Sequence, residues 1–203
     1  MREMIKNTLI LMVITLVAGL LLGVVYENTK DVIATQEVEA KKAAYKEVFN
    51  EASDFNALDD FMSDNVRRSL NQNGFEYENI DEINEALDAN GSLIGYVFTI
   101  TTKEGYGGDI TFTLGISKNG TVNGISILSI SETAGLGMEA DKVLKPQFAN
   151  RKVESFIYTK TGASAENEID AISGATITTN AITNGVNTGL YYFEKYLGGA
   201  DNE

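Results

Sequence analysis

The sequence contains neither cysteine nor histidine, and it is short of basic residues, with 16 Lys and Arg against 29 Asp and Glu and a formal net charge of −13. Without cysteine the chain has no disulfide, no thiolate nucleophile and no cysteine ligand for zinc or an iron–sulfur cluster. Without histidine it lacks the usual general base and the usual transition-metal ligand. The acidic balance argues against nucleic acid as a partner, because phosphate binding needs a basic face. Any chemistry must therefore use carboxylates, hydroxyls, lysines or a borrowed cofactor.

The 203 residues, of which 43% are apolar, are enough for one folded domain and an appendage. We find no residue set for acid–base or nucleophilic catalysis and no metal-ligating pattern, so we assign no catalytic and no metal residues. An autonomous enzyme is the interpretation that the residues favour least.

A long uncharged run near the N-terminus predicts a membrane anchor. Residues 8–26 carry no charge and, at about 1.5 Å per residue, nearly match a bilayer core of about 30 Å. Arg2 and Lys6 precede the run, so the positive-inside rule places the N-terminus in the cytoplasm and the rest outside. A cleavable signal peptide is the competing interpretation, since it also has a short basic start before an apolar stretch. We expect an uncleaved, single-pass anchor in the cell (inner) membrane over residues 1–28, touching lipid through residues 8–26.

The part outside the membrane is more acidic than the whole. Residues 1–26 hold two basic residues and one acidic residue, which leaves 14 basic and 28 acidic residues and a net charge of −14 for the remainder. Such a domain should stand off an anionic membrane surface. Its attachment is therefore expected to rest on the single helix and on protein partners.

The exterior part divides into two regions by composition. Residues 29–49 combine strong helix formers with apolar residues at a loose helical period, which predicts a stalk helix. Residues 50–90 are polar and contain a clear turn signal, so we expect short helices and loops there. We therefore predict a helical stalk and loop region over residues 29–90 and a folded domain over residues 91–203.

The predicted domain is α+β, an antiparallel β-meander packed by helices. The patterns that indicate its elements are β-rich alternation for strands, Gly and Asn-Gly for the turns between them, and a helical period of apolar residues for the last element. The predicted strands are residues 93–100, 110–116, 122–130 and 153–158, and the predicted helices are residues 139–148 and 178–197.

A hydroxyl-rich run precedes the last predicted helix. Residues 170–180 read D-A-I-S-G-A-T-I-T-T-N, and one interpretation is a loop that caps the helix, because Ser, Thr and Asn cap helices and Gly permits the turn. The same features make an anion site, since small residues allow close backbone approach and the amides of a helix start favour a phosphate. The residues alone leave both interpretations open.

The run D-A-I-S-G-A-T resembles the flavinylation motif of FMN-binding domains, in which the phosphate of FMN is joined to the Thr that ends S-G-A-T. The resemblance implies that Thr176 carries covalent FMN and that a separate flavin transferase attaches it, with Asp170 part of what that enzyme and its metal recognise. The cofactor-binding residues that it implies in this motif are Thr176, Ser173, Gly174, Ala175, Asp170, Thr178 and Thr179.

A second segment strengthens the resemblance. Residues 131–137, S-E-T-A-G-L-G, are similar to the E-T-P-G-L-G loop of the G subunit of the Rnf electron-transport complex and of the C subunit of the sodium-pumping NADH:quinone reductase, although Ala134 departs from the family's Pro. Taken alone, such a Gly-rich turn is also an ordinary strand-to-helix connection. The Gly-Tyr-Gly-Gly turn at residues 105–108 resembles the family's pattern too, and Lys142 is a candidate for stabilising reduced flavin. The candidates for lining the flavin in this loop are Glu132, Thr133, Gly135, Leu136 and Gly137.

The compact length and single anchor fit the Rnf subunit better than the quinone-reductase subunit. The resemblance implies an extracytoplasmic flavoprotein that relays electrons in an ion-translocating ferredoxin:NAD oxidoreductase, with the membrane subunits of that complex as partners. As an isolated chain its enzymatic status stays open. The alternatives are the C subunit of the quinone reductase, a flavin-binding redox sensor and a cofactor-free binding module.

Overall fold

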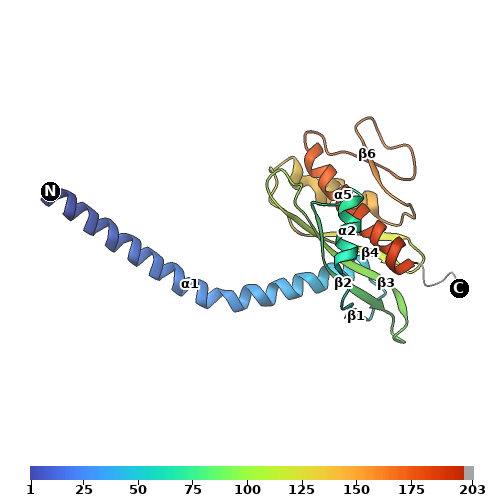
Figure 1. The fold of residues 1–203 in the computed structure, drawn as a ribbon, viewed down its shortest axis with the longest axis horizontal. Helices are drawn as coiled ribbons and strands as arrows, with labels where there is room; N and C mark the ends of the chain where they lie inside the picture. The colour runs from blue at the N-terminus through green and yellow to red at the C-terminus, as the bar shows by residue number, and fades with distance from the viewer. Residues whose placement is uncertain (199–203) are drawn as a thin grey trace. The chain divides into compact units, whose positions relative to one another are not determined.

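The computed structural model describes residues 1–198 (Figure 1). Within these residues the chain forms one long helix, a five-stranded sheet, a two-stranded sheet and several shorter helices. In chain order the elements are α1 (Arg2–Val48), β1 (Asp54–Ala57), α2 (Asp64–Gln72), β2 (Glu78–Leu87), β3 (Leu93–Thr102), β4 (Ile110–Ser117), β5 (Val122–Ser129), η1 (Gly137–Glu139), α3 (Ala140–Val143), α4 (Lys145–Phe148), β6 (Ile157–Thr159), β7 (Glu168–Asp170), α5 (Thr176–Tyr192) and η2 (Phe193–Leu197).

The N-terminal apolar run lies in α1, which is long and apolar enough to cross a membrane. The predicted anchor and the predicted stalk form this one continuous helix, as expected from the strong helix formers after Tyr26. The chain separates into two compact units, residues 1–42 and residues 43–203. The predicted domain boundaries at residues 28 and 90 stay predictions.

The main sheet is an antiparallel meander in which sequence neighbours pair. Its strand order is β1-β2-β3-β4-β5, and each strand pairs antiparallel with the next. In β3 and β4 the side chains alternate between the two faces, as the period of two in the sequence predicts. The α+β fold class predicted from the sequence is confirmed.

Helix α5 covers one face of the sheet (Figure 1). Phe98 and Ile100 of β3 pair with Leu114 and Phe112 of β4, and all four side chains are fully buried in the main core with Ile182 of α5. The close approach of α5 to the sheet depends on small residues in the helix. This packing fixes where α5 begins relative to the sheet.

The opposite face receives the last turn of α1. Tyr45, Val48 and Phe49 form a second, smaller core with Val97 of β3 and Ala86 of β2. The Tyr45 hydroxyl lies 3.2 Å from the hydroxyl of Thr99 and accepts a hydrogen bond from the Asn84 amide at 3.1 Å. The end of α1 is therefore part of the folded domain.

Residues 50–90 differ from the sequence prediction. This region holds strands β1 and β2 in addition to helix α2, so the expectation of only short helices and loops is wrong. The pattern does not indicate β2 because its sequence, ENIDEINEAL, carries charged and amide side chains on a strand with both faces partly covered. Its acidic residues lower β-propensity, and pairing with β3 overrides that preference.

Two further boundaries differ. The predicted strand over residues 153–158 is wrong for most of its length, because the strand is β6, Ile157–Thr159, and it pairs in parallel with β7. The predicted helix over residues 139–148 is divided into η1, α3 and α4, with Pro146 in the first turn of α4.

Both edges of the main sheet are blunted. Strand β1 has four residues and begins with Asp54, and its outer side pairs with no strand among the residues described. At the other edge, Val122 of β5 pairs with Arg151 in an isolated antiparallel bridge, and α4 packs against the same strand. Short, charged and covered edges oppose pairing with another chain.

Candidate functional site

Three segments that are distant in the sequence surround a pocket of about 530 Å³. They are the turn at residues 105–108, the loop at residues 131–137 and the start of α5. A volume in this range is typical of small-molecule sites. The lining residues are Tyr106, Glu132, Thr133, Leu136, Gly137, Gly174, Ala175, Thr176, Ile177 and Thr178.

The start of α5 is shaped by a tight turn. Gly174 has φ of +78°, a left-handed conformation that favours glycine, and the amide of Ala175 donates to the carbonyl oxygen of Ile172 at 3.0 Å. The N-cap residue is Ala175, whose side chain accepts no hydrogen bond. The first amides of a helix have no partner within the helix, so those of α5 remain available to an anion at its N-terminus.

Thr176 and the two threonines of the same helical turn differ in how they are used. The Thr178 and Thr179 side chains are buried, and their hydroxyls donate to Glu132 Oε2 at 3.0 Å and to the Ala175 carbonyl at 2.9 Å. Thr179 Oγ1 also accepts from the amide of Ile172 at 3.1 Å. Thr176 is half-buried, and within residues 1–198 its hydroxyl makes no hydrogen bond. Of the three threonines, Thr176 is the one that both lines the pocket and has a hydroxyl without a hydrogen bond among the described residues.

Glu132 joins the three segments. Its Oε1 accepts a hydrogen bond from the amide of Gly107 at 3.1 Å, and its Oε2 accepts one from Thr178. A Cβ on Gly137 would lie 2.5 Å from Thr178 Oγ1 and 2.7 Å from Glu132 Cβ, so this position leaves no room for a side chain. The carboxylate therefore ties the turn, the loop and the helix start together at one side of the pocket.

Exposed apolar side chains surround the pocket. Tyr106, Leu136 and Ile177 line it with exposed fractions of 72%, 39% and 51%, and Met138 is 43% exposed one residue beyond the lining residue Gly137. A Cβ on Gly174 would lie 3.0 Å from Leu136 Cδ2, which shows how closely the loop approaches the helix start. The mouth of the pocket thus offers apolar surface suited to a planar ring.

Eight of the twelve predicted cofactor-binding residues line the pocket. Four do not: Gly135, Asp170, Ser173 and Thr179. Asp170 ends β7, where its Oδ1 accepts from the amide of Ala163 at 2.6 Å. Ser173 and Gly135 are exposed beside the pocket, and Thr179 is buried beneath the helix start.

Sequence reasoning does not single out two of the lining residues. Tyr106 lies inside the Gly-Tyr-Gly-Gly turn, and Ile177 is an exposed apolar residue in the first turn of a helix. Both are large apolar side chains that are exposed, which identifies them as candidates for ligand contact. Their exposure can be seen only once the fold is known. Lys142 is outside the lining, with a highly exposed side chain 3.7 Å from Glu139.

The lining has little charge to hold a free phosphate. It contains one carboxylate, Glu132, and neither Lys nor Arg, as far as the described residues go. Uncapped amides at the helix start are then the available donors for phosphate oxygens. Such a site favours an anion of low charge, or one retained by a covalent bond.

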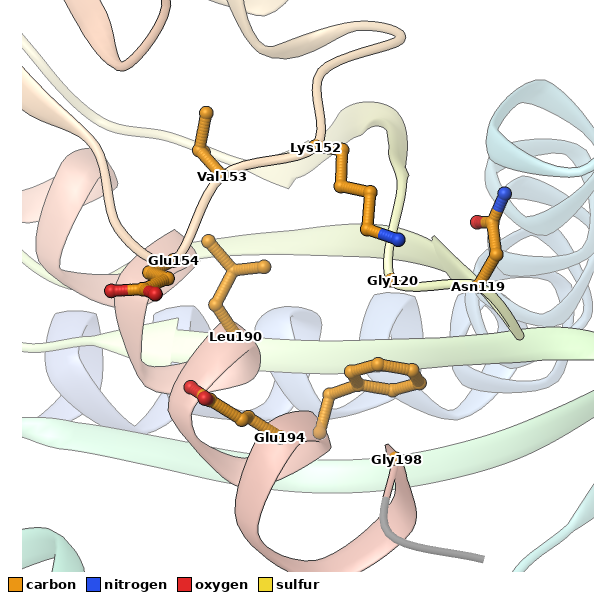
Figure 2. Close-up of a pocket in the computed structure, with 9 residues that line it drawn as sticks. Asn119, Gly120, Lys152, Val153, Glu154, Leu190, Glu194 and Gly198 are labelled. Atoms are coloured by element: carbon orange, nitrogen blue, oxygen red, sulfur yellow. The ribbon is translucent and has the colours of Figure 1, made fainter. Parts of the chain in front are cut away.

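A second cavity of about 340 Å³ lies toward the other end of α5 (Figure 2). Leu190 and Glu194 form one wall, and Lys152 and Glu154 come from the segment before β6. Leu190 is 14 residues beyond Thr176, about 21 Å along an α-helix. None of the predicted site residues lines this cavity.

Comparison with known proteins identifies the class of the folded domain. The family model for the FMN-binding domain matches residues 105–191, a range that includes the turn, the loop and the helix start that form the pocket. A crystal structure of the C subunit of the Na⁺-translocating NADH-quinone reductase from Parabacteroides distasonis shares the fold, with a TM-score of 0.50 and 18% identity, covering 71% of this chain and 77% of that chain. By class, the chain is an FMN-binding-domain protein with a long N-terminal apolar helix.

The whole chain defines the family more closely. The model for the RnfG N-terminal region matches residues 1–48. The chain is 33% identical to the G subunit of the Na⁺-translocating ferredoxin:NAD⁺ oxidoreductase complex of Acetobacterium woodii, over 93% of this chain and 91% of that protein. It is 28% identical to the G subunit of the proton-translocating complex of Clostridium ljungdahlii, over 90% and 88% of the two chains. The chain belongs to the RnfG family, the G subunits of Rnf complexes.

Proposed function

We propose that this chain is the electron-relaying flavoprotein subunit of an ion-translocating ferredoxin:NAD oxidoreductase complex, and that FMN is joined to Thr176 through its phosphate. The observation that carries the proposal is that Thr176 lines the pocket at an uncapped helix start, with a hydroxyl that makes no hydrogen bond among the described residues. Family membership over most of the chain supports the wider role.

The chemistry of the lining fits a phosphodiester better than a free FMN. A phosphate monoester carries close to two negative charges at neutral pH, and the lining has no basic side chain to neutralise them. Esterification to Thr176 leaves one charge, which the amides of the α5 start stabilise. The covalent bond also keeps the flavin at a high effective concentration beside the pocket, so tight binding is not needed. A flavin that leaves the pocket outside the cytoplasm therefore stays attached to the protein.

Each part of the pocket has a role in this proposal. The helix start orients the phosphate, and Leu136, Ile177 and Tyr106 supply apolar contacts for the ring system. Glu132 holds the three segments in place, since both of its carboxylate oxygens are occupied by protein donors. Bound FMN supplies the one-electron acceptor and donor chemistry that these side chains lack.

The proposed partners follow from the family. The other membrane subunits of the complex would exchange electrons with the flavin, a flavin transferase would attach it, and α1 would anchor the chain in lipid with residues 43–203 on the extracytoplasmic side. Two relatives are named for different ions, Na⁺ and protons, so the family does not fix the coupling ion. The alternative, the C subunit of the quinone reductase, is supported only by the shared fold.

Coexpression with a flavin transferase tests the linkage. The full chain should gain the mass of one FMN less one water and fluoresce as a band on a denaturing gel. Thr176→Val keeps the branched shape and removes the hydroxyl, so it should lose both signals. Thr133→Val, which removes an exposed hydroxyl from the same pocket, is the matched control and should keep them.

An unmodified wild-type chain, with the transferase active on another acceptor, would refute covalent attachment and favour the cofactor-free binding module. A modified Thr176→Val chain would move the linkage to another hydroxyl.

A further inference from the structure

A buried carboxyl group lies on the sheet beside α5, outside the pocket. Glu78, the first residue of β2, is 2% exposed. Its Oε1 accepts a hydrogen bond from the hydroxyl of Thr102 at 3.1 Å. Its Oε2 is the one buried side-chain oxygen or nitrogen in the described part of the chain that lacks a donor. A buried carboxylate oxygen without a donor is costly, which means that an ionised Glu78 is incompletely satisfied here.

A second carboxyl group, that of Glu104, is its neighbour. The Thr102 hydroxyl that donates to Glu78 also accepts from the amide of Glu104 at 3.2 Å, and the Glu104 carboxylate is one of the groups that raise the pKa of Glu78. Glu104 lies just after β3, and its Oε2 accepts from the amide of Asn184 at 2.6 Å and lies 3.5 Å from that of Asn180. Glu104 Oε2 therefore has two side-chain amides of α5 as its donors. A proton on Glu78 then gives its Oε2 a partner, because the protonated oxygen donates to the Glu104 carboxylate. One proton shared by the two carboxyl groups therefore satisfies the hydrogen-bonding requirement of both.

The charges around Glu78 agree with a bound proton. Burial away from water, together with the neighbouring Glu104 carboxylate, raises the pKa of Glu78 from about 4.5 to about 8, and the Thr102 hydrogen bond only partly opposes this. From α2, Arg67 donates to the backbone carbonyl of Glu78 at 3.3 Å, so its charge is directed at the carbonyl. From α5 the neutral amides of Asn180 and Asn184 donate to the neighbouring Glu104.

The carboxyl pair is connected to the proposed flavin site by two short paths. Asn180 and Asn184 follow Thr176 at intervals of four residues, so all three lie along one side of α5, and one turn of helix rises about 5.4 Å. Glu104 also immediately precedes the turn at residues 105–108, whose Gly107 amide binds Glu132. The pair is therefore one to two helical turns from the site where Thr176 would hold a phosphate.

We infer that Glu78 and Glu104 form a proton-binding site whose occupancy is linked to the charge of the cofactor at the start of α5. This inference rests on the proposed function. At an effective dielectric constant of about 20, one added negative charge about 10 Å away raises the pKa of a carboxyl group by roughly one unit. Adding an electron to the cofactor from an electrode would then be accompanied, between about pH 8 and pH 9, by uptake of a fraction of a solvent proton by the ionised Glu78 carboxylate, which forms the neutral acid.

The first experiment measures the proton without FMN. Infrared difference titration of the full chain, solubilised in mild detergent and prepared without the transferase, should show a protonated-carboxyl band that disappears near pH 8. Glu78→Gln should remove the band while its amide still donates to Glu104. Glu85→Gln, on the same strand and partly exposed, is the matched control and should keep it. A wild-type chain without the band at pH 6 would overturn the site.

The second experiment measures the linkage. In spectroelectrochemical titration of the FMN-loaded chain, the wild-type and Glu78→Gln midpoint potentials should vary in parallel below pH 8. Between about pH 8 and pH 9 the wild-type potential should fall further than that of Glu78→Gln, because reduction there takes up part of an extra proton, and at higher pH the two curves should again run parallel. Glu85→Gln should follow the wild type.

Parallel curves from pH 6 to pH 10 for wild type and Glu78→Gln would overturn the linkage even if the carboxyl band is present. A chain that accepts no FMN would instead refute the proposed function and the linkage together. The infrared result separates these failures, since it requires no flavin.

Discussion

At the scale of single residues, the site is distinguished by which side chains are occupied and which are open. The Thr179 hydroxyl is bonded to the backbone of the helix start, and the Glu132 carboxylate accepts from the Thr178 hydroxyl and the Gly107 amide. Thr176 differs because it lines the pocket and its hydroxyl makes no hydrogen bond among the described residues. Of these three threonines, Thr176 is therefore the one suited to modification, whereas Thr178 and Thr179 stabilise the structure around it.

Gly137→Ala should damage this arrangement. The added Cβ would meet Thr178 Oγ1 at 2.5 Å and Glu132 Cβ at 2.7 Å, so their hydrogen bond must shift. We expect a loss of about 1–3 kcal/mol in the free energy of unfolding, as for other overpacked sites, and weaker flavin incorporation. Denaturant unfolding and gel fluorescence measure the two effects.

Gly135→Ala is the matched control for that substitution. Its added Cβ meets nothing within 4 Å, and the cost comes from φ of +74° alone, about 1 kcal/mol. A pocket that tolerates Gly137→Ala as well as Gly135→Ala would contradict the role given to the Glu132 contact.

Glu78 should make the stability of the folded domain depend on pH. Its pKa is raised on folding to about 8, so the folded state binds a proton that the unfolded state has already lost above pH 4.5. The stabilisation is complete below pH 4.5 and declines by up to about 1.4 kcal/mol per pH unit until pH 8.

Glu78→Gln should remove this decline and become more stable than the wild type as pH rises from 5 to 8, measured by urea unfolding of the detergent-solubilised chain. Glu85→Gln should preserve the wild-type slope. Identical slopes for wild type and Glu78→Gln would contradict a raised pKa.

At the scale of secondary-structure elements, α5 positions the site because it packs so closely on the sheet. A Cβ on Gly185 would lie 2.7 Å from Cζ of Phe112, a fully buried ring. Gly185→Ala would normally favour a helix by about 1 kcal/mol, but here we expect a net loss of about 1–3 kcal/mol as the helix is pushed from the sheet. Thermal unfolding should show a lower midpoint, and an increase would contradict this packing.

The elements also show how far the sequence determines the fold. The alternating apolar strands β3, β4 and β5 and the periodic helix α5 were predictable because burial selects their patterns. Strand β2 was not predictable in this way, because its acidic and amide residues satisfy partners that only the folded chain supplies, such as Tyr45 for Asn84 and Thr102 for Glu78. Long-range partners leave no periodic signal.

The site was predictable to a similar degree. The loop and the helix start were found through motifs, whereas the contribution of Tyr106 and Ile177 depends on the turn and the helix meeting across the pocket. The acid pair of Glu78 and Glu104 is 26 residues apart in the sequence and carries no motif, so geometry alone reveals it.

At the scale of the whole molecule, the missing cysteines make the proposed topology directly testable. Glu3→Cys and Lys160→Cys each introduce one thiol at an exposed position before and after the apolar run. In right-side-out vesicles a membrane-impermeant maleimide should label Lys160→Cys at once and Glu3→Cys only after permeabilisation. The unmodified chain is the blank, and the reverse pattern would contradict an extracytoplasmic domain.

The blunted sheet edges have a consequence for a chain confined to a membrane. Molecules anchored in the plane of a membrane collide far more often than the same number dispersed in a volume. Each collision allows edge strands of two molecules to pair. Strand β1 is short and begins with Asp54, while β5 is covered through Arg151 and α4. Because the domains also repel one another through their shared negative charge, we expect neighbouring copies in a crowded bilayer not to join through the edges of their sheets.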